Sequence, residues 1–350
     1  MAVGRTGWIR VGMGVTVAGA VGLGLLAVPA GAGAAPQLPP VSPEDLVSSV
    51  LSAKPGPFNG TVELDNALGL PPIPQLPQAA NGTSTARVWS DGDHKGRLAV
   101  PTAQGERTIV ADGTTVWSWN SADRTVTRKP EGAGDRTAPE SAMTDPSGAA
   151  TQAIRKLRTT STVSVDGTAE VAGRPAYELV LAPAPTERTL LREVRIAVDA
   201  QKRVPLRLSV LANGSSAPAL QIGFTDVTFG PQDGSLFSFT PPPGATVTNA
   251  PAEHGPQGQQ GPPPGTKVIG DGWDAVVIGK VPTTGGSQGG APGAGRGNVA
   301  DLAGLGKPVS GSWGSGREIT TAVATAIITG DGRIAAGAVP EQVLTEALSK

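Results

Sequence analysis

Alternation of apolar and polar residues is the dominant pattern in the first two thirds of the chain. Val194, Ile196 and Val198 alternate with polar or small neighbours, and the same spacing recurs between residues 204 and 210. Side chains two residues apart share one face of a strand, so this period predicts strands with one buried face. Turn signals such as Asp112-Gly113 separate the segments, as β-hairpins require. The pattern predicts two series of strands, at 58–64, 84–90, 96–101, 104–111, 114–120 and 124–129, and at 162–171, 176–182, 191–198, 204–211, 219–229 and 236–240.

The apolar period lengthens at two places, where we expect helices. Residues 43–53 follow Ser42, which is a favourable N-cap residue. Residues 147–158 place Ile154 and Leu157 at helical spacing, so this helix is expected to cross over the sheet as a lid. We therefore predict a mainly β, α+β fold: a curved antiparallel half-barrel of about eleven strands, covered by helices and enclosing an apolar hollow.

The composition changes after the second series of strands. Segments 250–265 and 282–316 are rich in Pro, Gly or Gln and have too little apolar area to offset chain entropy, so both are predicted to be linkers. Between them, residues 266–281 are expected to form a small hairpin. Residues 317–350 are predicted to form a helix–strand–helix appendix of small α/β type, because the apolar residues within 317–329 fall on one helical face.

The N-terminus has the pattern of a signal peptide. Arg5 and Arg10 precede an uncharged apolar stretch at 11–28, and the small residues at 32–34 suit a cleavage site. We expect residues 1–34 to direct export, and the rest of the chain to act in a secreted or periplasm-like, extracytoplasmic space. The apolar stretch is almost long enough to span a bilayer, so an uncleaved N-terminal anchor is the alternative.

Charge and cysteine content narrow the function classes. The formal net charge of −1 becomes −3 once Arg5 and Arg10 are removed, and no basic cluster in the sequence indicates nucleic-acid binding. The chain has no cysteine, so it carries neither a disulfide nor the lipidated cysteine of a bacterial lipoprotein. We expect a monomer that does not bind nucleic acid.

No constellation of residues indicates catalysis or a cofactor. His94 lies in an expected hairpin turn, and His254 lies in the Pro/Gly linker, where nothing would fix its geometry. The string at 285–289 matches a serine-hydrolase elbow, but it lies in low-complexity sequence rather than between a strand and a helix. We predict no catalytic residue, no bound metal and no cofactor.

Two stretches carry a family resemblance: residues 236–247, Leu-Phe-Ser-Phe-Thr-Pro-Pro-Pro-Gly-Ala-Thr-Val, and residues 107–120, in which an Asp-Gly turn leads into the strand of Trp117 and Trp119. The first resembles the last strand, and the second the central hairpin, of the LolA family of periplasmic carriers, which shield lipid acyl chains. The resemblance spans residues 43–249 and implies a lipid-binding domain. The missing cysteine separates the chain from the LppX/LprG lipoproteins of similar fold.

One departure from the family bears on the cargo. The lipoprotein carriers have a basic residue soon after the tryptophan that corresponds to Trp89, whereas the nearest basic residues here are Lys95 and Arg97. This departure argues against a triacylated lipoprotein and leaves acyl-chain binding open.

The resemblance implies an extracytoplasmic carrier, not an enzyme, that binds acyl chains of a lipid or lipoprotein. The residues expected to line its cavity are Val88, Trp117, Trp119, Tyr177, Leu179, Val194, Ile196, Leu206, Leu208, Ile222 and Phe224. Ile154 and Leu157 are expected on the lid. An apolar, proline-stiffened loop is expected to form the mouth of the cavity, with Leu70, Ile73 and Leu76 at its lip.

Two other interpretations compete with the carrier. The first is an envelope sensor or regulator like RseB/MucB, whose LolA-type domain holds back a membrane anti-sigma factor; this interpretation gives the chain a membrane-protein partner. The second is a structural envelope protein with a filled core, because alternation does not show whether the space between inward residues is empty.

Overall fold

The computed structural model describes residues 36–69, 82–130, 151, 154–250, 265–280 and 306–350. The chain divides between Gln37 and Leu38, and every element described below belongs to the part from Leu38 onward.

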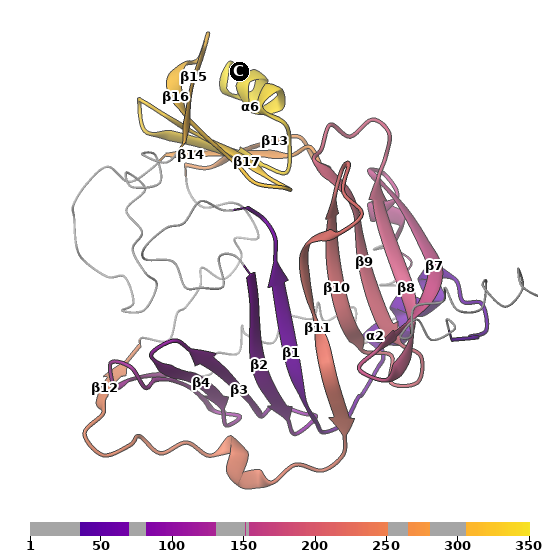
Figure 1. Cartoon of the computed structure of the whole chain (residues 1–350), viewed down its shortest axis with the longest axis vertical. Helices are drawn as coiled ribbons and strands as arrows, with labels where there is room; N and C mark the ends of the chain where they lie inside the picture. The colour runs from indigo at the N-terminus through magenta and orange to yellow at the C-terminus, as the bar shows by residue number, and fades with distance from the viewer. Residues whose placement is uncertain (1–35, 70–81, 131–150, 152–153, 251–264, 281–305) are drawn as a thin grey trace, which may run out of the picture. The chain divides into compact units, whose positions relative to one another are not determined.

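Twelve strands form one large sheet in the order β12-β6-β5-β4-β3-β2-β1-β11-β10-β9-β8-β7 (Figure 1). All neighbours are antiparallel except β12, which runs parallel to β6. The sheet is curved and open, and β12 and β7 are its two edges. The strands are β1 (Phe58–Asn66), β2 (Gly82–Ser90), β3 (Gly96–Thr102), β4 (Gly105–Ala111), β5 (Thr115–Asn120), β6 (Thr125–Pro130), β7 (Ser161–Val171), β8 (Arg174–Pro183), β9 (Leu191–Asp199), β10 (Pro205–Ala212), β11 (Pro218–Phe229) and β12 (Thr246–Asn249).

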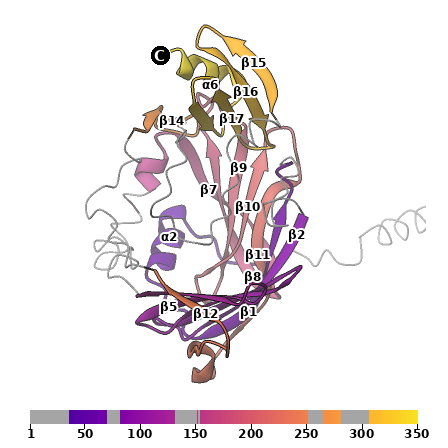
Figure 2. The same cartoon turned by 90° about the vertical axis from the view of Figure 1, so that its left-hand side faces the viewer.

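Helix α2 (Pro43–Leu51) covers one face of β7–β9 (Figure 2). The hydroxyl of its N-cap residue, Ser42, accepts a hydrogen bond of 3.0 Å from the backbone N–H of Asp45, as the capping pattern predicts. Leu46 is fully buried in a cluster with Ile154, which belongs to a second helical segment at 154–157. The predicted mainly β fold with a helical cover is confirmed. Residues 147–150 and 152–153 of the expected second helix lie outside the described residues.

The strand expected at 236–240 is wrong. Gly234–Phe237 form a short 3₁₀ helix, η2, whose N-cap Asp233 accepts a hydrogen bond of 2.9 Å from the backbone N–H of Ser235. Three prolines follow at 241–243, and proline cannot donate to a strand ladder, so the chain resumes pairing only at β12. Phe237 is nevertheless buried, and it holds this segment on the sheet.

A smaller sheet lies in the C-terminal part of the chain, in the order β13-β14-β18-β17-β16-β15. Helix α6 (Glu341–Leu348) packs on one of its faces, and buried Val276, Ile327, Ala335 and Leu344 form the centre of their shared core. The expected hairpin at 266–281 is not separate, because β14 also pairs with β18. The strands are β13 (Lys267–Ile269), β14 (Val276–Lys280), β15 (Lys307–Gly311), β16 (Gly314–Thr320), β17 (Thr325–Thr329) and β18 (Arg333–Gly337).

The prediction of a helix at 317–329 is wrong, because this segment forms most of β16 and all of β17. The two strands are joined by a tight turn in which the backbone N–H of Thr321 donates to the carbonyl of Ala324 at 2.8 Å. Ile319 lies opposite Ala326, so residues that would share a helical face meet across a hairpin instead. β16 also pairs with β15, and β17 also pairs with β18, so the backbone hydrogen-bonding groups of both strands find partners. The β-branched residues of this segment favour strands over a helix. Strand β18 and helix α6 lie where the sequence predicts them.

Within the described ranges, no helix is both long enough and apolar enough to cross a bilayer. The apolar stretch at 11–28 lies outside those ranges.

Candidate functional site

Strand register assigns each side chain of the large sheet to one of its two faces. Residues directly opposite each other on paired strands share a face. Leu179 lies opposite Ile196, Ile196 lies opposite Leu208, and Leu208 lies opposite Ile222. Because Leu179 and Ile196 pack with α2 in one cluster, all four side chains belong to the helix-covered face.

The helix-covered face continues into the other half of the sheet. Ile222 lies opposite Leu64 of β1, and Gly60 of the same strand lies opposite Val88 of β2. Val88 in turn lies opposite Leu98 of β3. We name the apolar side chains on this face the apolar strip, and define it as Val62, Leu64, Val88, Val194, Ile196, Leu208 and Ile222.

Side chains on this face become more exposed with increasing distance from the helices. Tyr177 and Leu179, beneath α2, are only 5% and 7% exposed. Ile222, in the middle of the sheet, is 42% exposed, and Leu64 and Val88 are half-buried. The helices therefore cover only part of an apolar face that extends farther than their cover.

Two members of the apolar strip, Val62 and Leu64, were absent from the sequence-based list. Their signal was present, since both alternate with the acidic residues Glu63 and Asp65. The assignment needed the pairing of β1 with β11, which brings together residues about 160 positions apart and is not readable from local pattern.

Tyr177 lies beneath α2, at the end of the face that the helices cover. Its hydroxyl donates a hydrogen bond of 3.0 Å to the carbonyl of Pro39, and the guanidinium of Arg203 lies 5.1 Å from its ring centre. The polar end of this side chain is thus satisfied while its ring stays in the core, as buried tyrosines require.

Trp117 and Trp119 lie on the opposite face from the apolar strip. Trp117 is opposite Val110, and Val110 is opposite Arg97, whose partner across β2 is Trp89. The indole N–H of Trp117 donates to Asp112 at 3.1 Å. Both tryptophans share one face of their strand, as predicted, but the structure does not bring them to the other cavity candidates.

Leu206 departs from the strip, whereas Phe224 lies opposite Val62 of the strip. The register shifts between Pro205 and Arg207, so Leu206 enters a separate buried cluster with Val171 and Ala176. Phe224 packs against that same cluster. Its ring lies edge-on to Phe58, with centroids 6.1 Å apart.

The two lid candidates differ in burial. Ile154 is 1% exposed and contacts the α2 cluster, whereas Leu157 is 38% exposed. Arg158, which follows the helical segment at 154–157, forms an ion pair of 2.5 Å with Glu44 of α2. The mouth-loop candidates Leu70, Ile73 and Leu76 lie outside the described residues.

The opposite face of β8–β10 carries a network of charged side chains beside the cluster that contains Leu206. Arg195 contacts Glu178 at 3.0 Å and Glu193 at 2.8 Å, and Arg207 contacts Glu178 at 2.8 Å. The hydrogen bond from Arg195 holds the pKa of Glu193 below its ordinary value, although burial opposes the shift. This network makes part of that face polar, whereas the opposite face carries the apolar strip.

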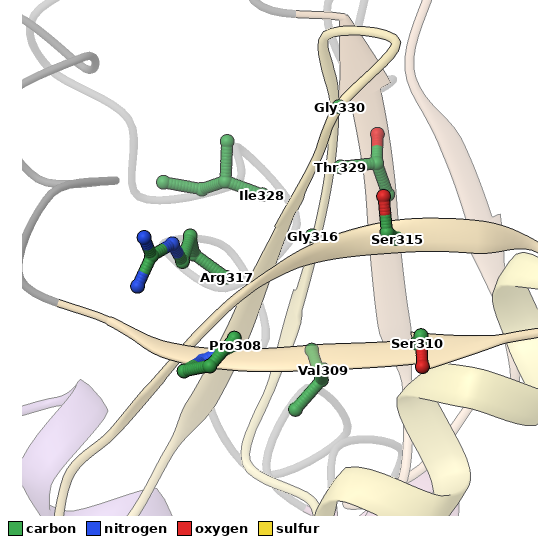
Figure 3. Close-up of a pocket in the computed structure, with 9 residues that line it drawn as sticks. All are labelled: Pro308, Val309, Ser310, Ser315, Gly316, Arg317, Ile328, Thr329 and Gly330. Carbon is green, nitrogen blue, oxygen red and sulfur yellow. The ribbon is translucent and has the colours of Figure 1, made fainter.

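The smaller sheet bears an open pocket of about 540 Å³ over β15–β17 (Figure 3). Arg317 lies opposite Ile328, and the two side chains extend to the same side of the sheet (Figure 3). Arg317 donates to the carbonyl of Gly306 at 3.0 Å. The lining is mixed, with no titratable side chain besides this guanidinium among the residues that line it.

The described part of the chain contains no group of three or more His, Cys, Asp or Glu side chains that could hold a metal ion. His94 is exposed in the β2–β3 turn, 3.1 Å from Asp93. His254 lies outside the described residues.

No family model and no curated protein matches the chain. Among solved structures, the Pseudomonas aeruginosa MucA/MucB complex is 16% identical over 87% of this chain and 94% of that chain, with a TM-score of 0.43. An uncharacterized conserved protein from Thermus thermophilus is 13% identical over 59% and 96%, with a TM-score of 0.35. A LolA superfamily protein from Nitrosomonas europaea is 12% identical over 57% and 99%, with a TM-score of 0.25. Both groups that the sequence resembles are thus among the similar structures, and at these identities the likeness concerns the fold alone.

Proposed function

We propose that this protein is an extracytoplasmic carrier that binds the acyl chains of a lipid or lipoprotein on the apolar strip. The observation that carries the proposal is the exposure of Ile222, 42%, in a strip that is continuous with the buried cluster beneath α2. A contiguous apolar surface of this kind on a folded protein typically marks a binding site.

The energetics suit a carrier that takes up and releases its cargo. Each methylene removed from water contributes about 0.8 kcal/mol, so an acyl chain of about fourteen carbons gains some 11 kcal/mol before ordering costs. Ordering of the chain and of the lid offsets part of this gain. The remaining affinity is compatible with transient extraction from a bilayer.

The helical cover shields only the end of the strip that lies beneath α2. The two helical segments are linked by the Arg158–Glu44 ion pair, in which the arginine side chain is 49% exposed. Exposed ion pairs contribute about 0–1 kcal/mol, so this link yields readily when the cover moves. Opening of residues 154–157 also withdraws Ile154 from the buried cluster that it shares with α2 and the strands.

The first experiment is mass spectrometry of organic extracts from the purified protein and from the Ile222→Asp variant. We expect the wild type to carry co-purified lipid and the variant to lose most of it, because an aspartate in the strip places an uncompensated charge against acyl chain. Thr228→Asp is the matched control, since Thr228 is exposed on the same strand and on the opposite face. Absence of lipid from the wild type, or equal loss in both variants, would refute the carrier.

A second candidate is the RseB/MucB-like regulator that binds a membrane protein. The observation that favours it is the extent of the C-terminal sheet, which has six strands, a helix and its own core. Affinity capture from solubilised membranes, with the full chain and with a chain truncated after residue 250, distinguishes the two functions. A membrane protein captured only by the full chain supports the regulator.

A further inference from the structure

The face of β2–β6 opposite the apolar strip carries a row of alternating arginine and tryptophan side chains. Trp89 lies opposite Arg97, and Trp117 lies opposite Arg128, with Val110 between the two pairs. Neighbouring strands lie about 4.8 Å apart, so the row extends some 20 Å across five strands. Arg87 lies two residues before Trp89 on the same face and joins the row. We define the arginine–tryptophan patch as Arg87, Trp89, Arg97, Trp117 and Arg128.

The guanidiniums of this patch are stacked on rings rather than paired with carboxylates. Arg87 lies 4.9 Å and Arg97 5.9 Å from the ring centre of Trp89, and Arg128 lies 5.3 Å from that of Trp117. Among the described residues, none of these three arginines forms an ion pair. Stacking holds the guanidinium planes in place and leaves their N–H groups available.

Arginines of β8–β10, in contrast, form ion pairs with carboxylates. Arg174 pairs with Asp199, and Arg195 and Arg207 both pair with Glu178. These pairs neutralise the positive charge on β8–β10. The charge of the arginine–tryptophan patch is therefore a local feature, although the whole chain is nearly neutral.

An uncharged segment lies beside the patch. Residues 234–250 contain no charged side chain, and they include two phenylalanines and three consecutive prolines. Arg97 donates to the carbonyl of Leu236 at 3.5 Å, and the ring of Phe239 lies 5.6 Å from that of Trp117. Figure 1 shows this segment, in salmon, running from β11 to β12. The segment thus places a backbone carbonyl at Arg97 and an aromatic ring beside Trp117, and it supplies no carboxylate.

We propose that the arginine–tryptophan patch docks the protein on a bilayer surface that carries anionic phosphate headgroups. Guanidiniums bind phosphate oxygens through paired hydrogen bonds, and tryptophan is enriched at the depth of lipid headgroups. An uncharged aromatic and proline segment beside the cations suits a bilayer surface, because it can enter the headgroup region without burying a charge. The patch lies on the face opposite the apolar strip, so docking leaves the strip free.

The test is sedimentation with lipid vesicles of residues 38–350, the part of the chain that contains both sheets and lacks the apolar N-terminal stretch. One set of vesicles is phosphatidylcholine alone, and the other is an equimolar mixture with phosphatidylglycerol. We expect binding to the anionic vesicles that weakens with added salt, because exposed charges are screened. Each arginine near the surface contributes about fivefold to partitioning, so the variant Arg87→Gln/Arg97→Gln/Arg128→Gln should bind roughly a hundredfold more weakly.

The matched control removes the same charge elsewhere. Lys267, Lys280 and Lys307 are exposed on the smaller sheet, and their triple substitution by glutamine should lower partitioning by no more than about threefold. Circular dichroism and thermal melting verify that both triple variants fold. Equal weakening in the two variants, or binding to phosphatidylcholine as strong as to anionic vesicles, overturns the proposal. Neither outcome depends on whether the apolar strip retains lipid, so the result is independent of the carrier function.

Discussion

Asp199 shows how one residue can set the stability of the large sheet. Its side chain is fully buried at the end of β9 and pairs with Arg174 through two hydrogen bonds. It also accepts hydrogen bonds of 2.8 and 2.5 Å from the backbone N–H groups of Gln201 and Lys202. Burial raises the pKa of this carboxyl, but these four hydrogen bonds outweigh it and hold the pKa below its ordinary value. The carboxylate thereby fixes the turn between β9 and β10.

Substitution of Asp199 is expected to destabilise the protein strongly. Asp199→Ala leaves Arg174 partly buried without its partner and should lower the free energy of unfolding by about 3–5 kcal/mol in urea titration. Asp166→Ala is the control, because that side chain is 71% exposed and its ion pair with Arg195 is long, at 4.0 Å. We expect its effect to stay within about 0.5 kcal/mol.

The pH dependence of this contribution follows from the direction of the shift. A carboxyl whose pKa is lower in the folded state contributes stability above its unfolded pKa, about 3.9, and loses it as the pH falls through the folded value. The stability difference between wild type and Asp199→Ala should therefore be constant from pH 7 to about 5 and shrink below about 4. A difference that grows on acidification would contradict the role of the carboxylate.

At the scale of elements, close packing of backbones decides where the smaller sheet admits a side chain. A Cβ at Gly316 of β16 would lie 2.5 Å from the carbonyl oxygen of Ile328 on β17. A Cβ at Gly279 of β14 would meet nothing nearer than 3.9 Å. Both strands lie one position from an edge of the same sheet, so the two glycines make a matched pair.

The pair yields a direct comparison. Gly316→Ala forces β16 and β17 apart and should cost about 1–3 kcal/mol, measured by the midpoint of urea unfolding. Gly279→Ala meets ordinary van der Waals space and should be neutral or slightly stabilising. A large loss in the Gly279 variant would mean that the smaller sheet tolerates no added side chain at either position.

At the scale of the whole molecule, neither net charge nor mean composition indicates the arginine–tryptophan patch or the apolar strip. The formal charge of −1 suggests no preference for anionic partners, yet Arg87, Arg97 and Arg128, which form no ion pair among the described residues, gather on one face of β2, β3 and β6. Likewise, the apolar strip draws its side chains from strands at both ends of the large domain sequence, β1–β2 and β9–β11. Both surfaces are products of the strand order.

If the apolar strip binds acyl chains, ligand should stabilise the whole fold. A free fatty acid at about 100 times its dissociation constant adds about 2.7 kcal/mol, which corresponds to a rise in melting temperature of about 4 °C for a chain of 350 residues. Thermal melting with palmitate should show this rise in the wild type, and Ile222→Asp should show little of it. Butyrate, which has the same headgroup and too few methylenes, is the control ligand. A rise with butyrate equal to that with palmitate would point to the carboxylate rather than the apolar chain.

Local interactions explain what the sequence by itself determined. The period-2 pattern located β1 to β11 because alternation is a property of each strand, and Ser42 marked the start of α2 because an N-cap acts on its own first turn. Local sequence pattern likewise predicted the strand and the final helix of the C-terminal segment, which are β18 and α6. Turn residues such as Asp112 and Gly113 separated strands for the same reason, since their hydrogen bonds lie within a few residues.

Tertiary structure decided the face of the sheet on which each residue lies. Alternation shows that Trp117 and Trp119 share a face, but only pairing through β3 and β4 shows that it is the face opposite Ile222. A register shift at Pro205 separates Leu206 from Leu208, although their spacing predicts a common face. The segment 317–329 likewise took the structure that its strand partners imposed. Register, bulges and strand order arise from contacts between residues far apart in the chain, and a local pattern carries no information about such contacts.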